Sequence, residues 1–294
     1  MTETEEIKRC IAGQLPLKWQ KIVTGIDFEG LEEIRLRCAQ PAMAYYSERR
    51  GELLCSGERC VAGRCDMENI LAAICKNSVY TYSGDIARGF VTMRGGHRAG
   101  ISGRGVVSRG EISSLTQISG INIRVARQKK GCADRLIHSV ADDGGVKNTL
   151  IISPPQCGKT TILRELARLL SEKYKVTIVD ERSELAAMTD GCPGFDVGRQ
   201  TDVLDSVPKS AGIFMALRSL SPEIILTDEI DVGGDIAAIH SILGAGAKII
   251  TSVHSVDARS FGRLNREFMS LFEAVIVLSR RRGAGTVEEI INAE

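Results

Sequence analysis

Residues 150–161 read LIISPPQCGKTT, an apolar run that leads into a short loop and then into the start of a helical pattern. The loop Ser153–Thr160 has the spacing of a phosphate-binding motif that ends in Gly158, Lys159 and Thr160. In such a loop, successive backbone N–H groups at the start of a helix form a nest that binds anions. The order of strand, loop and helix therefore predicts an α/β domain that binds a nucleotide.

The members of this loop have distinct predicted roles. Lys159 is expected to reach the β- and γ-phosphates of ATP, and the Thr160 hydroxyl to ligate Mg²⁺. Thr161 is expected to close the loop over the phosphates, so ATP and Mg²⁺ are the predicted cofactors. The predicted nucleotide-binding residues are Ser153, Pro154, Pro155, Gln156, Cys157, Gly158, Lys159, Thr160 and Thr161.

Two loop positions depart from the usual form of the motif. Ser153 and Gln156 stand where this motif commonly carries glycine. Glycine adopts positive φ angles freely, whereas serine and glutamine adopt them at a cost of about one to a few kcal/mol. We therefore expect the two substitutions to act on nucleotide affinity and rate rather than on the fold.

A second motif follows about 70 residues after the loop. Residues 223–229 read EIILTDE, an apolar run that ends in two adjacent carboxylates. A buried strand presents such a pair at its carboxyl end, beside the phosphate loop. Asp228 is predicted to hold Mg²⁺, largely through water, and Glu229 to orient or deprotonate the attacking water.

Two further apolar runs end in residues that could take part in the chemistry. Residues 176–182 read VTIVDER, and either Asp180 or Glu181 could share the water-activating role with Glu229. Residues 249–254 read IITSVH, and a neutral His254 at the strand end could sense the γ-phosphate through a hydrogen bond. The predicted catalytic residues are Lys159, Glu229, Glu181 and His254.

The pattern of the chain predicts two domains. Beyond residue 145, β-like and helical runs alternate, which indicates a mostly parallel sheet covered by helices. Before it, amphipathic helical patterns mix with short β-like runs broken by glycine, which indicates an α+β domain. The polar stretch Asp142–Gly145 suits a linker, so the predicted domains are residues 1–141 and 146–294.

Two local features of the first domain can be predicted in more detail. Ile34, Leu36 and Cys38 alternate with charged residues, with the period of a half-buried strand. The helical pattern around Ile70 has Asp66 as its predicted N-cap, because aspartate accepts hydrogen bonds from the free N–H groups of a first helical turn.

Composition narrows the class of protein. The chain has 38 basic and 37 acidic residues, and a formal net charge of +1, so no global field attracts it to nucleic acid or to an anionic membrane. No apolar run approaches the roughly 18–20 residues that span a bilayer, and the acidic N-terminus does not look like a signal peptide. These features predict a cytoplasmic protein.

ATPases of this kind often complete their site with an arginine from a neighbouring subunit, which stabilises charge in the transition state. For any single arginine, solvation or a surface ion pair is the more common role. The candidates in this sequence are Arg94, Arg98, Arg124, Arg127, Arg218, Arg280, Arg281 and Arg282.

With these residues in place, the chain resembles the stage III sporulation protein AA family of endospore-forming bacteria, which is itself similar to ATPases of type II and type IV secretion. The resemblance runs nearly end to end. It is carried by EIRLR at 33–37, GGHR at 95–98, NIRVAR at 122–127, GCAD at 131–134, DERSE at 180–184, TDVL at 201–204 and RSLSPE at 218–223.

The resemblance implies a RecA-like ATPase core that forms a hexameric ring with nucleotide between subunits. It implies membrane-embedded sporulation channel proteins as partners, and a place in the mother cell, peripheral to the membrane, where the ATPase powers or gates a channel into the forespore. In the secretion ATPases, the stretches similar to Asp180–Glu181 and Thr251–His254 are acidic and histidine boxes that line the nucleotide.

Three functions remain open on the sequence. The leading one is an oligomeric motor or gating ATPase. The second is a nucleotide-dependent scaffold, in which the altered loop binds ATP but Glu229 turns it over very slowly. The third is a nucleic-acid motor, which the near-neutral charge and the aromatic content of 4% disfavour, because few rings are present for bases to stack on.

Overall fold

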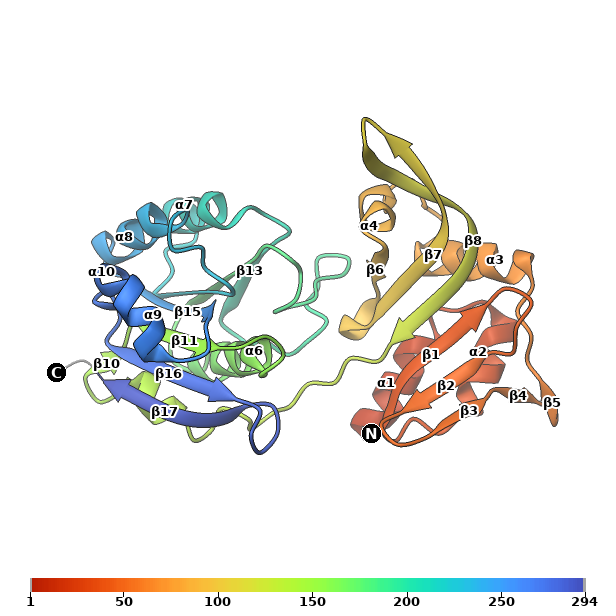
Figure 1. Ribbon diagram of the computed structural model, residues 1–294, viewed down its shortest axis with the longest axis horizontal. Helices are drawn as coiled ribbons and strands as arrows, with labels where there is room; N and C mark the ends of the chain where they lie inside the picture. Colours follow the sequence, from red (N-terminus) through yellow and green to blue (C-terminus); the bar gives the residue numbers. More distant parts are fainter. Residues whose placement is uncertain (1, 293–294) are drawn as a thin grey trace. The chain divides into compact units, whose positions relative to one another are not determined.

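The computed structural model describes residues 2–292 and divides into two compact units. The first unit contains Met1–Arg127 with Met188–Gly194, and the second contains Gln128–Ala187 with Phe195–Glu294. Each unit has its own sheet and its own buried core (Figure 1).

The first unit is built on an antiparallel sheet of six strands in the order β3-β2-β1-β8-β7-β6. A small hairpin of β4 and β5 accompanies it. The strands are β1 (Leu31–Arg37), β2 (Met43–Tyr46), β3 (Arg50–Glu52), β4 (Leu54–Cys55), β5 (Glu58–Arg59), β6 (Phe90–Thr92), β7 (Arg98–Ser108) and β8 (Glu111–Arg124). The helices are α1 (Glu3–Ala12), α2 (Leu17–Thr24), α3 (Arg64–Ile74), α4 (Ser83–Ala87) and the 3₁₀ turn η1 (Arg94–Gly96).

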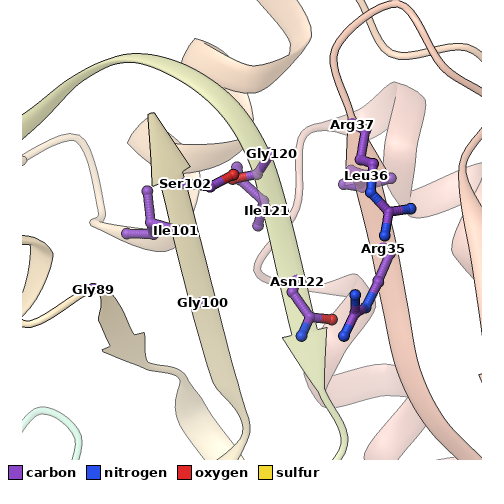
Figure 2. Close-up of a pocket in the computed structure, with 10 residues that line it drawn as sticks. All are labelled: Arg35, Leu36, Arg37, Gly89, Gly100, Ile101, Ser102, Gly120, Ile121 and Asn122. Atoms are coloured by element: carbon purple, nitrogen blue, oxygen red, sulfur yellow. The ribbon is translucent and has the colours of Figure 1, made fainter. Parts of the chain in front are cut away.

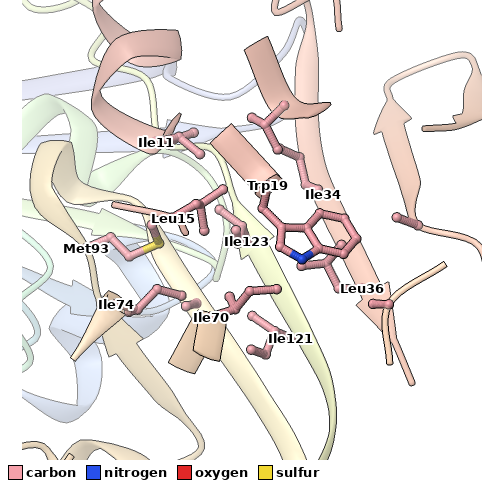
Figure 3. Close-up of a cluster of buried hydrophobic side chains, with 14 of the residues drawn as sticks. Ile11, Leu15, Trp19, Ile34, Leu36, Ile70, Ile74, Met93, Ile121 and Ile123 are labelled. Atoms are coloured by element: carbon pink, nitrogen blue, oxygen red, sulfur yellow. The ribbon is translucent and has the colours of Figure 1, made fainter. Parts of the chain in front are cut away.

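One face of this sheet packs against helices and forms the core of the unit. Ile34 and Leu36 of β1 are fully buried, as their alternation with charged residues predicts. Trp19 lies against them, together with side chains from α1 and α3 (Figure 3). This unit therefore has the α+β architecture expected from its mixed pattern.

The predicted N-cap of α3 is wrong by one turn. The helix begins at Arg64, with Gly63 as its N-cap, and Asp66 is the third helical residue. The Asp66 carboxylate accepts the Gly63 N–H at 2.9 Å and the Trp19 indole N–H at 3.1 Å. Asp66 therefore stabilises the helix start from inside the first turn, in the capping-box position, and joins it to α2.

The other face of the sheet has a cleft of about 290 Å³ along β1, β7 and β8 (Figure 2). Gly100 and Gly120 contribute only backbone to its wall, while Arg35, Arg37 and Asn122 contribute polar side chains. The Arg35 guanidinium donates to Glu33 at 2.7 Å. None of the ten residues that line the cleft is acidic, histidine or cysteine, so it offers no acid–base pair or metal site.

The second unit is built on a seven-stranded sheet in the order β13-β12-β14-β15-β11-β16-β17. All neighbouring strands are parallel except β16 and β17, which pair antiparallel. The strands are β11 (Thr149–Ser153), β12 (Val176–Asp180), β13 (Thr201–Asp205), β14 (Ile224–Thr227), β15 (Lys248–His254), β16 (Ala274–Ser279) and β17 (Thr286–Asn292).

Helices cover both faces of this sheet, which is why its central strands are apolar on both sides (Figure 1). The helices are α5 (Ile137–Val140), α6 (Lys159–Leu170), α7 (Lys209–Ser219), α8 (Ile236–Gly244), α9 (Ala258–Leu264) and α10 (Arg266–Met269). α7 to α10 share one core with the sheet, and α6 lies on the opposite face. This is the predicted RecA-like P-loop core, a mostly parallel sheet with flanking helices.

The stretch proposed as a linker has a regular structure. Ala141–Asp142 (β9) and Gly145–Val146 (β10) pair as a two-stranded antiparallel ribbon, with the glycines at its turn. The division into compact units falls between Arg127 and Gln128 instead. Within residues 2–292, no helix combines the length and apolar character needed to cross a membrane.

Candidate functional site

The carboxyl ends of four parallel strands bring the predicted site residues to one edge of the second sheet. β15 lies between β11 and β14, so His254 lies between the phosphate loop and the acidic pair Asp228–Glu229. Ser153 and His254 are register partners at the ends of β11 and β15. Ligands of open α/β sheets bind at this edge, because the strand ends and the helix N-termini converge there.

Gly158 shapes the end of the phosphate loop. It is the N-cap of α6 and adopts the left-handed conformation, with φ of 89° and ψ of 16°. A Cβ atom at this position would lie 3.2 Å from the backbone nitrogen of Gly285. Two independent constraints, the φ angle and the close backbone, therefore require glycine here.

Gly158→Ala is expected to lower the melting temperature by about 2–8 °C, because strain of about 1–2 kcal/mol is added to the folded state. Gly244→Ala is the matched control, since Gly244 lies in α8 with no atom within 4 Å of an added Cβ. It should be neutral or stabilising, because alanine favours the helix by about 0.5–1 kcal/mol. Differential scanning fluorimetry checks both, and equal melting temperatures would contradict the requirement for glycine.

The two unusual loop residues behave differently. Gln156 has φ of 60°, so it occupies the left-handed conformation that glycine would adopt more easily. Ser153 does not belong to the residues with positive φ; it is the fully buried last residue of β11. The backbone cost predicted for both positions therefore applies to Gln156 alone.

Lys159, His254 and Glu229 form a continuous hydrogen-bonded chain. The Lys159 Nζ lies 2.9 Å from His254 Nδ1, and His254 Nε2 lies 2.7 Å from Glu229 Oε1. A protonated lysine can only donate, so Nδ1 accepts and Nε2 carries the proton that is donated to Glu229. The Arg182 guanidinium binds the other Glu229 oxygen at 2.9 Å. Both oxygens of the predicted base are thus held in fixed directions.

Asp228, which directly follows β14 and precedes Glu229, is almost fully buried. Burial and the nearby charge of Asp180 raise the pKa of its carboxyl to about 6, and Lys209 acts in the opposite direction. In the part of the chain that is described, its carboxylate makes no hydrogen bond or ion pair closer than 4 Å. A carboxylate that is buried without a hydrogen-bond or ion-pair partner is stabilised when it binds a cation.

The side chain of Asp180 holds the loop that follows β12. Its buried carboxylate accepts the backbone N–H groups of residues 184, 185 and 186 at 2.8–2.9 Å. Burial raises the pKa of Asp180, and these three hydrogen bonds act against that rise. The side chain that remains directed outward from this stretch is Glu181, whose carboxylate lies 3.6 Å from Lys209 Nζ and is partly exposed.

Lys209 is a site residue that sequence reasoning missed. It is buried at the start of α7, and its Nζ donates to the backbone carbonyl of Glu229 at 2.7 Å. Glu229 itself has φ of 39°, a conformation that needs support from its surroundings. The sequence shows only a lone lysine ahead of an apolar run, which gives no hint of its partners.

The residues at this edge fit the two predicted cofactors. Within residues 2–292, the backbone N–H groups of residues 156–161 donate to no other group, so they are available to phosphate oxygens. The Thr160 hydroxyl likewise has no partner among these residues, and it matches the free Asp228 carboxylate as a hard oxygen ligand for Mg²⁺. Burial lowers the pKa of Lys159, as expected for a cation held inside a loop.

The candidate arginines lie in different surroundings. Arg280 contacts the phosphate loop through Gln156 at 3.1 Å, and Arg281 pairs with Glu288 of β17 at 3.5 Å. Arg218 is exposed on α7. Of those in the first unit, Arg127 donates to the Phe28 carbonyl, Arg124 approaches Glu33, and Arg94 pairs with Asp190.

Three comparisons relate the chain to known proteins. The family model described as "Sporulation stage III, protein AA" matches residues 1–294. The "Stage III sporulation protein AA" of Bacillus subtilis (strain 168) is 39% identical over 276 residues, which cover 90% of this chain and 87% of that protein.

Solved structures show the same fold at low sequence identity. The ATPase DotB of Legionella pneumophila superposes with a TM-score of 0.58 at 16% identity, covering 90% of this chain and 76% of DotB. The pilus retraction motor PilT, solved with bound ADP, gives a TM-score of 0.58 at 13% identity, covering 94% of this chain and 78% of PilT.

Proposed function

The chain belongs to the stage III sporulation protein AA family, and from this membership and the site geometry we propose that it is an ATPase that powers or gates a sporulation channel. It binds MgATP and hydrolyses it to ADP and phosphate. The observation that carries the proposal is the pair of hydrogen bonds that link Lys159 to His254 and His254 to Glu229. They lie at the sheet edge that also holds Asp228.

Each site residue has a role in this proposal. The backbone N–H groups of the loop and Lys159 bind the phosphates, while Thr160 and Asp228 hold Mg²⁺. Bound MgATP supplies a phosphoryl group whose charge the metal partly neutralises. Glu229 orients the attacking water and accepts its proton, with its carboxylate directed by His254 and Arg182. Glu181, next to Lys209, is the alternative base.

His254 links nucleotide binding to the base. Its imidazole joins the lysine of the phosphate loop to Glu229, so a shift of Lys159 toward a phosphate changes the hydrogen bond on Nδ1. This is the sensor role expected of a histidine at the end of a central strand.

A scaffold with little turnover is the second candidate. The ion pair between Arg182 and Glu229 favours it, because the guanidinium occupies one of the two oxygens of the carboxylate that would have to accept a proton from water. Under this alternative the protein binds ATP and releases phosphate very slowly. A nucleic-acid motor has no comparable support from the residues of the site.

The assembly and partners are part of the proposal. We place the protein on the mother-cell side, as a hexameric ring peripheral to the membrane through embedded channel proteins. Sedimentation at saturating ATP tests the ring, and a species that stays monomeric argues against it. Pulldown of membrane-embedded sporulation proteins tests the channel role, and the absence of any such partner removes it.

Steady-state release of phosphate from MgATP, measured across a range of protein concentrations, tests the central proposal. Turnover should rise cooperatively with concentration and disappear in Lys159→Ala. Nucleotide binding without turnover supports the scaffold, and DNA-stimulated turnover supports the nucleic-acid motor. Absence of both binding and turnover contradicts all three.

A further inference from the structure

Residues 280–285, which form the turn between β16 and β17, contact the phosphate loop. Arg280 and Gln156, which meet there, are 124 residues apart in the sequence. The backbone N–H of Gly285 donates to the Cys157 carbonyl at 2.8 Å. The Arg280 guanidinium donates to the Gln156 side-chain oxygen at 3.1 Å. One backbone and one side-chain hydrogen bond thus join residues 280–285 to consecutive residues of the loop.

The two segments also pack directly against each other at Gly158. The space where a Cβ atom would stand lies 3.2 Å from the Gly285 nitrogen and 3.6 Å from the Ala284 carbonyl carbon. The side of the loop next to α6 is therefore closed by the backbone of the turn. The loop therefore cannot move toward the turn at Gly158 without displacing residues 284 and 285.

Gln156 is the member of the loop that most needs such support. Its φ of 60° lies in the left-handed region, which is unfavourable for a non-glycine residue. A hydrogen bond from a charged donor is stronger than a neutral one, so the Arg280 contact can offset part of this cost. Glycine at this position would adopt the same backbone without an anchor.

Resting on the proposed ATP binding, we infer that residues 280–285 form a clasp that holds the phosphate loop in its ATP-binding shape. Within the clasp, Arg280 is a positioning residue that acts through Gln156. Its guanidinium is engaged with the loop of its own chain, so its role does not depend on a neighbouring subunit. The clasp explains how a glutamine is accommodated where glycine is usual.

Affinity for ATP, measured by isothermal titration calorimetry on the full chain, tests the role of Arg280. Arg280→Ala should weaken ATP binding about three- to tenfold, as expected for the loss of one charge-assisted hydrogen bond. Arg280→Lys, which keeps a cationic donor, should recover part of this loss. Arg281→Ala is the matched control, because it removes the same charge from the same turn without touching the loop.

The glutamine itself supplies the decisive comparison. In a Gln156→Gly background the loop needs no anchor, so adding Arg280→Ala should weaken ATP binding no further. If Arg280→Ala weakened ATP binding equally in the wild-type and Gln156→Gly proteins, the role of Arg280 would be overturned. An equal loss would indicate a general electrostatic effect of Arg280 on ATP, which does not depend on residue 156. An Arg281→Ala variant that loses as much affinity as Arg280→Ala would overturn it as well.

A measurement without nucleotide separates the clasp from ATP binding. Cys157 is buried inside the loop, and its thiol lies 3.6 Å from the Pro155 carbonyl oxygen. Arg280→Ala should raise the rate of Cys157 alkylation by iodoacetamide several-fold, resolved from the other cysteines by peptide mass spectrometry, whereas Arg281→Ala should not. An unchanged rate overturns the clasp. A raised rate in a protein whose wild type binds no ATP supports the clasp and contradicts the proposed function.

Discussion

Glu229→Gln should lower kcat for ATP hydrolysis by about 10²–10⁴-fold, the contribution typical of a general base, while ATP binding is retained. The reason is that glutamine keeps the shape and can still accept the His254 hydrogen bond, but cannot take a proton from water. Single-turnover phosphate release and equilibrium binding of ATP measure the two effects separately. The variant should therefore trap ATP on the protein.

Glu181→Gln is the matched carboxylate control. Glu181 makes an ion pair with Lys209 but does not contact His254, so its loss should have a much smaller effect on kcat. If Glu181→Gln were the slower variant, Glu181 would be the base and Glu229 a positioning residue. If neither substitution changed the rate, the assignment of a carboxylate base at this edge would be wrong.

Asp228→Asn should stabilise the protein at neutral pH in the absence of Mg²⁺ and nucleotide. The pKa of Asp228 is raised from 3.8 to about 6 in the folded chain, chiefly because burial disfavours its charge. This difference corresponds to about 3 kcal/mol that the ionised carboxylate costs the folded state. The buried amide has a desolvation cost of its own, so the expected net gain in unfolding free energy is about 1–3 kcal/mol.

The sign of the pH dependence follows from the direction of the shift. The folded protein binds the proton of the Asp228 carboxyl more tightly than the unfolded chain does. Protonation of Asp228 therefore contributes its full stabilisation of the wild-type fold below about pH 4, and this contribution is lost as the pH rises through about 6. The unfolding free energy of Asp228→Asn should therefore rise relative to that of wild type between pH 4 and 6. Above pH 6 the difference between the two proteins should stay constant. Urea unfolding of both proteins between pH 4.5 and 8 measures the difference.

Saturating MgATP should reverse the order of stability, because wild-type Asp228 then gains a cation and the asparagine variant binds it more weakly. A difference between the two proteins that did not vary with pH would show that Asp228 titrates normally. A variant that kept its advantage in MgATP would argue against Asp228 as a ligand for Mg²⁺.

Local sequence signals were sufficient for much of the second unit. Apolar runs at 150–152 and 224–226 and the mostly apolar run at 249–253 correspond to β11, β14 and β15, because strands buried on both faces carry few polar side chains. β13 and β17 had no such signal. They lie at the two edges of the sheet, are partly exposed, and carry polar residues at most positions.

The N-cap of α3 shows the limit of a local rule. Aspartate near a helix start stabilises the free N–H groups from more than one position, so its presence does not fix the first residue. Gly63 holds the N-cap position because Asp66 binds its N–H from within the helix and the Trp19 indole binds the same carboxylate. The contact with Trp19 joins residues 47 apart.

The sequence by itself determined the phosphate loop, the acidic pair and the alternating α/β pattern, since each depends on neighbours within a few residues along the chain. Only the tertiary structure decided which of those residues meet: His254 between Lys159 and Glu229, Lys209 on the Glu229 carbonyl, and Arg280 on Gln156. These contacts depend on the strand order β14-β15-β11-β16, which places distant segments side by side. Strand order is set by the packing of the whole sheet, and no local periodicity encodes it.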